Sequence, residues 1–386
     1  MKRIISRCMA VLLTVAMILT MSMTAFASEE AVTGAAATGK LTVNNTVAGK
    51  KLDLYQIFTA VNANGSVLYT LNTAYDGFFK EKVDNGATLE EEALSKAAYE
   101  YVKTQVGDTG EAETAKTFAK DILAWILAAK DDVKTAVDAT LTPANTTDGS
   151  TVIDNMEYGY YLVYPEGATD TSSAPGNQTY TSVASLVSVT GDTSINMKSN
   201  YPTVVKKVND NKNADDVNIG EEVTYTLTSK VPDMTGYTSY VFNFKDTLST
   251  GLTFKGITSV TVGSGENVQN VTAGTGDNTY TLTQDGQNIT ITMNNFLASN
   301  ANKAGQEIKV TYTATLNKDA VTGFDANKNS ATVEYSNKPG TTDKGESKPS
   351  IVDVHTFNFT IFKYYLNGAD KTGLAKAEFE LYKANG

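Results

Sequence analysis

Three polar residues stand in phase with apolar neighbours on segments that read as β-strands. They are Lys206 in NYPTVVKKVND, Asp246 in FNFKDTLSTGLTF and Asn329 in NKNSATVEYSN. Side chains two residues apart on a strand share a face. A charged or amide group on an apolar face is costly unless it is paired. Since the three come from the first, a middle and the last predicted strand of one domain, we expect them to meet.

If they meet, the three groups can react with one another. Burial lowers the pKa of a lysine and raises that of an aspartic acid, so that both can be neutral. A neutral amine at Lys206 is then a nucleophile and the Asn329 carboxamide an electrophile, while a protonated Asp246 moves protons as ammonia leaves. The product is an intramolecular Lys206–Asn329 isopeptide bond. The alternative is a lysine at a sheet edge, whose charged head stays in water.

A covalent cross-link would suit this chain because its exported part has no cysteine. The first 27 residues carry a basic start, the apolar run CMAVLLTVAMILTMSMT and a small-residue site for cleavage between Ala27 and Ser28. This pattern is typical of a secretory signal peptide. The single cysteine, Cys8, lies inside it, so disulfides cannot stabilise the mature protein.

The elements that must position these groups are mainly β. Residues 28–199 read as an N-terminal β domain with a helical insert at 88–139, beginning after Thr88 as N-cap. Residues 200–352 alternate with period two and have frequent turns, which predicts an antiparallel, immunoglobulin-like β-sandwich. Its end, NKPGTTDKGESKPS, reads as a link. Residues 353–386 begin a third β domain that is too short to bury a core, and we expect the natural protein to continue.

Several functional classes are excluded by composition. The formal net charge of −11 argues against nucleic acid or an anionic membrane surface as a partner. The sole histidine, His355, falls in the predicted linker and rules out triads and metal sites that need several histidines. We expect no metal, no cofactor and no turnover enzyme.

The segments YPTVVKKVND, IGEEVTYTLTSKVPD, FNFKDTLSTGLTF and KNSATVEYSN resemble, in order and spacing, the isopeptide-forming domain of Gram-positive backbone pilins. These fimbrial subunits are polymerised by class C sortases. The resemblance implies that Lys206 and Asn329 form the bond and that Asp246 is the catalytic acid. The N-terminal domain is similar to the first domain of such pilins. The final segment resembles the start of a Cna B-type domain, with Lys363 as its bond lysine.

The resemblance also implies a lysine that joins subunits, normally in a YPK motif. This sequence has Tyr201-Pro202-Thr203 instead. Lys198 is the first candidate for the linking lysine and Lys207 the second; a solvated surface lysine is the alternative reading of each. The sorting signal for attachment to peptidoglycan is not in the sequence and is expected beyond Gly386.

Two functions follow from the resemblance. The first is a structural shaft subunit on the Gram-positive cell wall, with a class C sortase and neighbouring copies of the same pilin as partners. The second is a cell-wall-anchored adhesin, or a minor pilin at the tip or base, that binds a host or surface ligand. The missing lysine at position 203 keeps the second alternative open.

Overall fold

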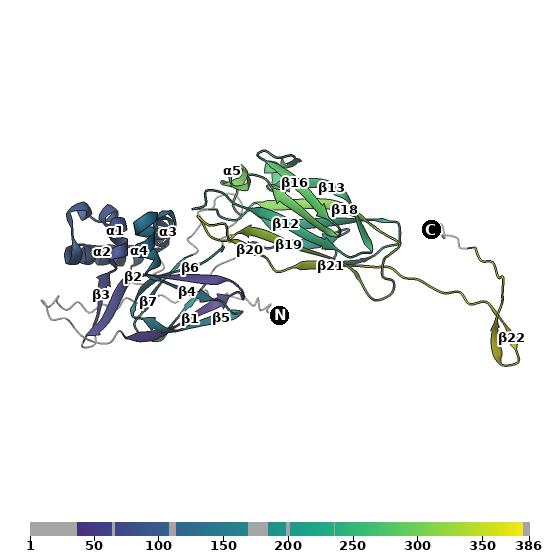
Figure 1. Cartoon of the computed structure of the whole chain (residues 1–386), viewed down its shortest axis with the longest axis horizontal. Helices are drawn as coiled ribbons and strands as arrows, with labels where there is room; N and C mark the ends of the chain where they lie inside the picture. The colour runs from purple at the N-terminus through teal and green to yellow at the C-terminus, as the bar shows by residue number, and fades with distance from the viewer. Residues whose placement is uncertain are drawn as a thin grey trace, which may run out of the picture.

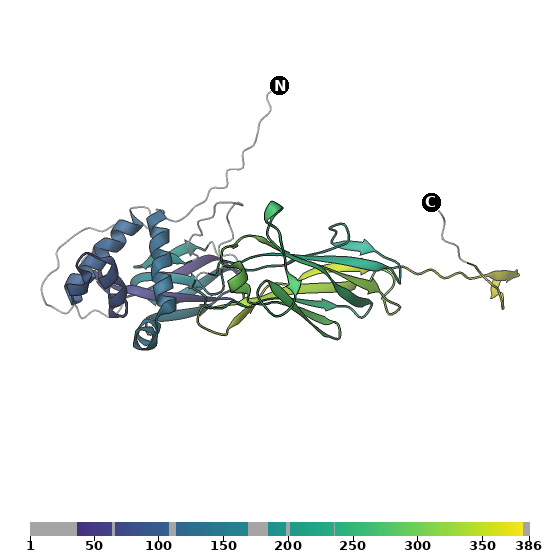
Figure 2. The same cartoon turned by 90° about the horizontal axis from the view of Figure 1, so that it is seen from above.

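The computed structural model describes residues 37–63, 66–107, 113–168, 184–197, 201–234 and 236–380. The predicted signal peptide and its cleavage site, Ala27 and Ser28, lie outside these residues. Within them the protein is mainly β, with two sandwich domains in tandem along an elongated chain (Figures 1 and 2). The predicted fold class is therefore confirmed. No helix among the described residues is long and apolar enough to cross a membrane.

The first domain packs two sheets against each other. The smaller sheet has the order β5 (Gly149–Glu157), β1 (Thr38–Thr46), β8 (Thr193–Asn196). The larger has the order β3 (Ser66–Leu71), β2 (Lys51–Ala63), β6 (Gly159–Pro165), β7 (Ser185–Val189), and β4 (Leu141–Asn145) also pairs with β2. Every residue of β6 is buried. This central strand is a continuous apolar run because it is covered on both faces.

Four helices cover the outer face of the larger sheet (Figure 1). They are α1 (Asp76–Lys82), α2 (Glu91–Val106), α3 (Glu113–Ala128) and α4 (Asp131–Asp138). The helical region thus begins before residue 88. The sequence does not reveal α1 because a helix of this length is too short to show a helical period. The predicted N-cap is wrong: Thr88 donates its hydroxyl to the carbonyl oxygen of Asn85, and α2 has Glu90 at its N-cap position.

The second domain is a sandwich around one apolar core. Its five-stranded sheet has the order β14 (Gln269–Asn270), β13 (Leu252–Val262), β18 (Glu307–Leu316), β11 (Glu222–Lys230), β9 (Val205–Val208). The facing sheet has the order β10 (Ala214–Asp216), β21 (Ser350–His355), β19 (Asn327–Ser336), β12 (Phe242–Leu248), β17 (Asn288–Met293), β16 (Thr279–Asp285), β15 (Thr272–Ala273). β20 (Lys344–Glu346) pairs with β19, and the short helix α5 (Phe296–Asn300) follows β17.

The end of this domain differs from the prediction. β19, which carries Asn329, is not the last strand, because β21 pairs with it and with β10. His355 is the last residue of β21 and does not lie in a linker. Beyond it, β22 (Tyr364–Asn367) and β23 (Asp370–Gly373) form a separate hairpin in which every residue is exposed (Figure 1).

Candidate functional site

Lys206, Asp246 and Asn329 converge inside the second sandwich. β9 holds Lys206 opposite Leu227 of β11 in the five-stranded sheet. Asp246 on β12 lies opposite Ala331 of β19 in the facing sheet, and Asn329 is two residues before Ala331 on that strand. Asp246 and Asn329 are therefore diagonal neighbours on one sheet face, a distance that side chains can span. The amine of Lys206 reaches them across the core.

These side chains are withdrawn from solvent. Lys206 is 1% exposed, Asp246 2% and Asn329 0%. The predicted inward orientation is therefore observed for all three, and the reading of Lys206 as a solvated edge lysine is excluded. An amine and a carboxyl group without water must find their partners within the protein.

The hydroxyl of Tyr312 joins the three groups. Lys206 Nζ donates to Asp246 Oδ2 and, at 2.7 Å, to the Tyr312 hydroxyl oxygen. Asn329 Nδ2 donates to the same oxygen, also at 2.7 Å. The Tyr312 hydroxyl in turn donates to Asp246 Oδ2 at 2.8 Å. Lys206 Nζ and Asn329 Nδ2 each lie 2.7 Å from the Tyr312 hydroxyl oxygen, so the two nitrogen atoms are close to each other.

Two aromatic rings surround the amine. Lys206 Nζ lies 4.9 Å from the ring centre of Tyr225 and 5.0 Å from that of Tyr312. The two rings stack with centres 5.2 Å apart. Such faces attract a cation and exclude water. They also fix the side chain of Lys206, so that its nitrogen stays near the carboxyl and amide groups.

Burial shifts the pKa values in the direction that favours proton transfer. Loss of hydration lowers the pKa of Lys206 to about 8, although Asp246 opposes the shift. Burial raises the pKa of Asp246, against the effects of Lys206 and Tyr312. Both shifts stabilise the neutral forms of the pair. A neutral amine next to a protonated acid is thus more accessible here than in water.

Two oxygen atoms at the site lack hydrogen-bond partners among the described residues. They are Asp246 Oδ1 and Asn329 Oδ1, and both are buried. Leaving such an atom unpaired costs roughly 1–3 kcal/mol. A proton on the carboxyl group would give Asp246 a donor for the amide oxygen. The unpaired atoms belong to the two groups that must interact if the amide is to be activated.

Sequence reasoning missed Tyr312. Tyr312 lies on β18 in phase with Val310 and Ala314, and all three are buried. A tyrosine in this pattern is an ordinary core residue in most sandwiches, so its phase carries no functional information. Only the positions of the other three side chains show that its hydroxyl lies between them.

The other predicted lysines are not at this site. Lys198 lies outside the described residues. Lys207 faces away from the core and donates to Asn213 Oδ1 at 2.7 Å. Lys363 is exposed before β22, with no acid or amide partner brought to it among the described residues. Among those residues there is also no group of three or more histidine, cysteine or acidic side chains that could hold a metal ion.

A partly buried lysine connects the two domains. Lys338 follows β19 and donates to Asp53 Oδ2 of β2 and, at 2.9 Å, to Glu166 Oε1 after β6. Asp53 is 2% and Glu166 5% exposed. Nearby, Lys50 Nζ donates to the Tyr335 hydroxyl at 2.6 Å. The segment that reads as a link in the sequence thus carries part of an interface between the domains.

The second domain is similar to a known protein family. Residues 219–339 match a family model described as Gram-positive pilin backbone subunit 2, Cna-B-like domain. The matched stretch contains Asp246, Tyr312 and Asn329, and Lys206 precedes it. No curated protein matches the sequence.

Solved structures of major pilins are similar to this chain. The T6 backbone pilin of Streptococcus pyogenes serotype M6 is 19% identical, with 87% of this chain and 68% of that chain covered and a TM-score of 0.43. The major pilin SpaD of Corynebacterium diphtheriae is 18% identical, with 82% and 65% covered and a TM-score of 0.40. The C-terminal fragment of the major pilin GBS80 of Streptococcus agalactiae is 22% identical, with 41% and 57% covered and a TM-score of 0.35. The chain thus spans 57% to 68% of the length of these three.

Proposed function

We propose that this chain, whose residues 219–339 match the model of the Gram-positive pilin backbone family, is the structural shaft subunit of a covalently polymerised, cell-wall-anchored pilus. The observation that carries the proposal is the buried cluster of Lys206, Asp246, Tyr312 and Asn329. A shaft transmits force along its length, and a covalent bond across the core resists unfolding where a disulfide is not available.

In the proposed reaction, the neutral amine of Lys206 attacks Cγ of Asn329. A bond forms between Lys206 Nζ and Cγ, and the bond from Cγ to Nδ2 breaks. Asp246, protonated by its burial, hydrogen-bonds the amide oxygen and stabilises the negative charge that develops there. The amine loses one proton and the leaving nitrogen gains one, so the products are an amide and ammonia.

Tyr312 gives the proton a short route. Its hydroxyl contacts both Lys206 Nζ and Asn329 Nδ2, and it donates to Asp246. A proton released by the amine reaches the leaving nitrogen through this hydroxyl and the carboxyl group. Fixed placement supplies the remaining acceleration, since effective molarities reach roughly 10⁵–10⁸ M in well-oriented intramolecular reactions. The bond forms once in each molecule, so the protein is not a turnover enzyme.

The bond would join the two sheets of the sandwich. β9 opens the domain in one sheet, and β19 lies in the other, with β20 and β21 after it. The segment between Lys206 and Asn329 contains most of the domain. A force applied to the two ends of the chain would then act on the cross-link before it acts on the strands between Lys206 and Asn329.

The partners follow from the same proposal: a class C sortase, neighbouring copies of the protein and, through a sorting signal, peptidoglycan. The second candidate is an adhesin or a minor pilin at the tip or base, and the observation that favours it is Thr203 in the motif position of the linking lysine.

The experiment that separates the two candidates examines surface protein from the native organism on a denaturing gel. A shaft subunit gives a ladder of regularly spaced species that survives boiling, because the copies are joined by amide bonds. A single band at the mass of one copy would overturn the shaft assignment and leave the lone adhesin.

A further inference from the structure

A shaft subunit must present one accessible amine to which the next subunit is joined. We infer that Lys230, at the end of β11, is this acceptor, and that its substrate is the acyl group of a peptide thioester carried by a cysteine transpeptidase. The inference rests on the proposed function and names the residue that the sequence does not reveal.

The strand register places Lys230 beside Thr203. β9 and β11 pair antiparallel, with Val205 opposite Thr228. Two residues farther along this register, Thr203 comes opposite Lys230, just beyond the start of β9. Ser229 Oγ donates to the carbonyl oxygen of Thr203 at 2.6 Å and holds the two segments together there.

Opposite residues in an antiparallel pair point to the same face, with Cβ atoms roughly 4.5–5.5 Å apart. Thr203 and Lys230 therefore share the outer face of the sheet, away from the core that Lys206 enters. The side chain of Lys230 starts about one strand spacing from the position that a lysine at 203 would occupy. Lys230 on the neighbouring strand can thus take the role of the lysine that the motif lacks at position 203.

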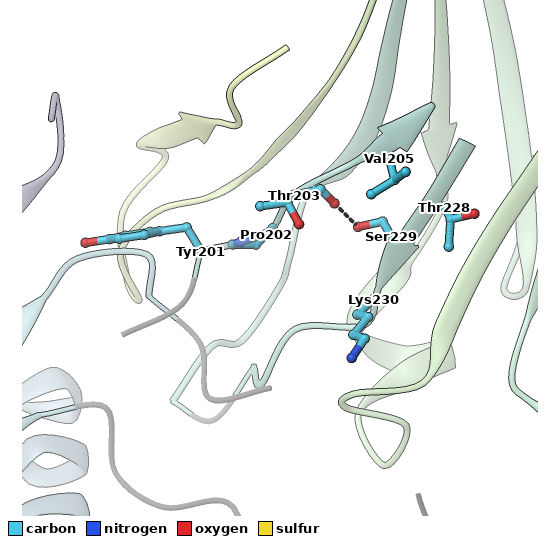
Figure 3. A pocket seen from close by; sticks show the side chains of 7 residues that line it. All are labelled: Tyr201, Pro202, Thr203, Val205, Thr228, Ser229 and Lys230. Atoms are coloured by element: carbon cyan, nitrogen blue, oxygen red, sulfur yellow. Dashed lines mark hydrogen bonds between the residues drawn. The ribbon is translucent and has the colours of Figure 1, made fainter. Parts of the chain in front are cut away.

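Lys230 also borders a groove. A cavity of about 150 Å³ is lined by Tyr201, Pro202, Thr203, Val205, Thr228, Ser229 and Lys230 (Figure 3). The apolar parts of this lining come from the tyrosine, the proline and the valine, and the threonines add hydroxyl groups. A cavity of this size can hold one side chain of an acyl-donor peptide beside the amine. The acyl donor would therefore be positioned by the same residues that form the altered motif.

Lys230 is better placed to react than Lys207. Lys230 is exposed, and among the described residues its amine forms no hydrogen bond or ion pair, including with Glu307 directly opposite on β18. Lys207 lies on the same outer face but donates to Asn213 Oδ1 at 2.7 Å and does not line the groove. An acceptor must be free to approach the thioester, and of these two lysines Lys230 combines that freedom with the groove.

The reaction is an acyl transfer. The neutral amine of Lys230 attacks the thioester carbon, an amide bond forms to Nζ, and the carbon–sulfur bond breaks. The proton lost by the amine ends on the sulfur of the transpeptidase, which is released as a thiol. No oxidant, reductant or metal is needed.

The test maps branched peptides in the polymer made by the native organism. Cell-wall polymer is digested with trypsin, and the lysine that carries the acyl group of a second copy is identified by tandem mass spectrometry. The same strain is made with Lys230→Arg, with Lys207→Arg as a matched control on the same face, and with the exchange Thr203→Lys plus Lys230→Thr.

We expect branching at Lys230, loss of the polymer in Lys230→Arg and a normal polymer in Lys207→Arg. The exchange variant is expected to polymerise through position 203. Polymer that branches at another lysine, Lys198 included, would overturn the assignment of Lys230 while leaving the shaft function in place. A chain that forms no polymer in the unaltered strain would overturn both.

Discussion

Lys206, which is fully buried, and Lys338, which is partly buried, have opposite properties. Lys206 in the core of the second domain faces one carboxyl group, a phenol and an amide, and burial lowers its pKa to about 8. Lys338 at the domain interface lies between two carboxylates, and their hydrogen bonds and charges raise its pKa despite burial. Burial lowers the pKa in both places, but Lys338 is less buried and has two carboxylate partners, so their attraction outweighs the loss of hydration there.

The comparison shows how the surroundings of a lysine set its charge: one environment favours the neutral amine that the proposed reaction needs, and the other keeps the cation that holds two domains together. With a single acid, which burial itself favours in the neutral form, Lys206 can lose its proton and become a nucleophile. With Asp53 and Glu166 on either side, Lys338 remains a cation and compensates part of their charge. A buried lysine is reactive only where its surroundings do not hold the proton on it.

The largest expected effect comes from removing the lysine in the core. Lys206→Ala deletes the proposed cross-link, which closes a loop of roughly 120 residues and is worth about 4–5 kcal/mol on the scale used for disulfides. We expect the melting temperature of the second domain to fall by roughly 10–20 °C. Asn329→Ala and Asp246→Ala should act in the same direction. Calorimetry of the purified chain measures this.

The matched control is Lys207→Ala, which removes a lysine from the same strand but from its outer face. Its melting temperature should stay close to that of the unaltered protein. Equal melting temperatures for Lys206→Ala and Lys207→Ala would show that no cross-link stabilises the core.

The second effect concerns the interface. Lys338→Ala leaves Asp53 and Glu166 buried without their cation, which typically costs about 3–5 kcal/mol. The two domains should lose their fixed arrangement while each keeps its own fold. Small-angle X-ray scattering would report a broader range of shapes, and circular dichroism an unchanged strand content.

Lys344→Ala serves as the control for the interface because Lys344 pairs with Glu334 in an ion pair that is 48% exposed on the lysine side. Exposed pairs contribute about 0–1 kcal/mol. A scattering curve for Lys338→Ala that matches the one for Lys344→Ala would contradict the role given to Lys338.

The third effect is on a rate. Tyr312→Phe removes the hydroxyl that contacts both nitrogen atoms, and we expect bond formation to slow by about 10²-fold, the lower range for a general acid–base group. The reaction should still reach completion because Lys206, Asp246 and Asn329 remain. The measurement is the fraction of unreacted chain, by mass, at increasing times after synthesis. Phe254→Leu is the control, since the Phe254 ring packs on Tyr312 with centres 5.6 Å apart and has no hydroxyl group; equal rates in both variants would exclude Tyr312 from the proton route.

The smallest effect is a dependence of domain docking on pH. Burial raises the pKa of Glu166 in the docked state above its usual value of 4.5. Docking therefore takes up protons, and it should strengthen as the pH falls from neutral toward the raised pKa of Glu166. Lys338 stays charged throughout, because its pKa is raised above 10.5.

The urea concentration at which the domains separate, followed by fluorescence transfer between labels on the two domains, should be higher at the lower pH. Glu166→Gln should remove most of this change. A separation midpoint that falls on acidification would show that loss of the ion pair outweighs protonation of Glu166.

The sequence predicted the core site because the period of a strand is two. That period alone places Lys206, Asp246 and Asn329 on the inner face, and their positions in different strands imply that they meet. The role of Tyr312 could not be predicted, since an inward tyrosine is common. The position of Lys230 beside Thr203 depends on the register between two strands, which a single sequence does not fix.

The interface was missed for a different reason. Lys338 lies in a segment rich in lysine, proline, glycine and threonine that reads as a solvated link. Its burial is contributed by Asp53 and Glu166, which are distant in sequence and belong to another domain. The composition of a segment indicates its own conformational preference. It does not show which surface of another domain packs on the segment.

The central claim is that the Lys206 amine and the Asn329 carboxamide form an amide bond inside the second sandwich domain. The most direct test is the intact mass of the secreted protein, followed by tandem mass spectrometry of its proteolytic peptides. The account predicts a mass lower by one ammonia than the mature sequence requires, and a branched peptide that joins Lys206 to Asn329. A full mass, with both residues recovered in separate linear peptides, would contradict it.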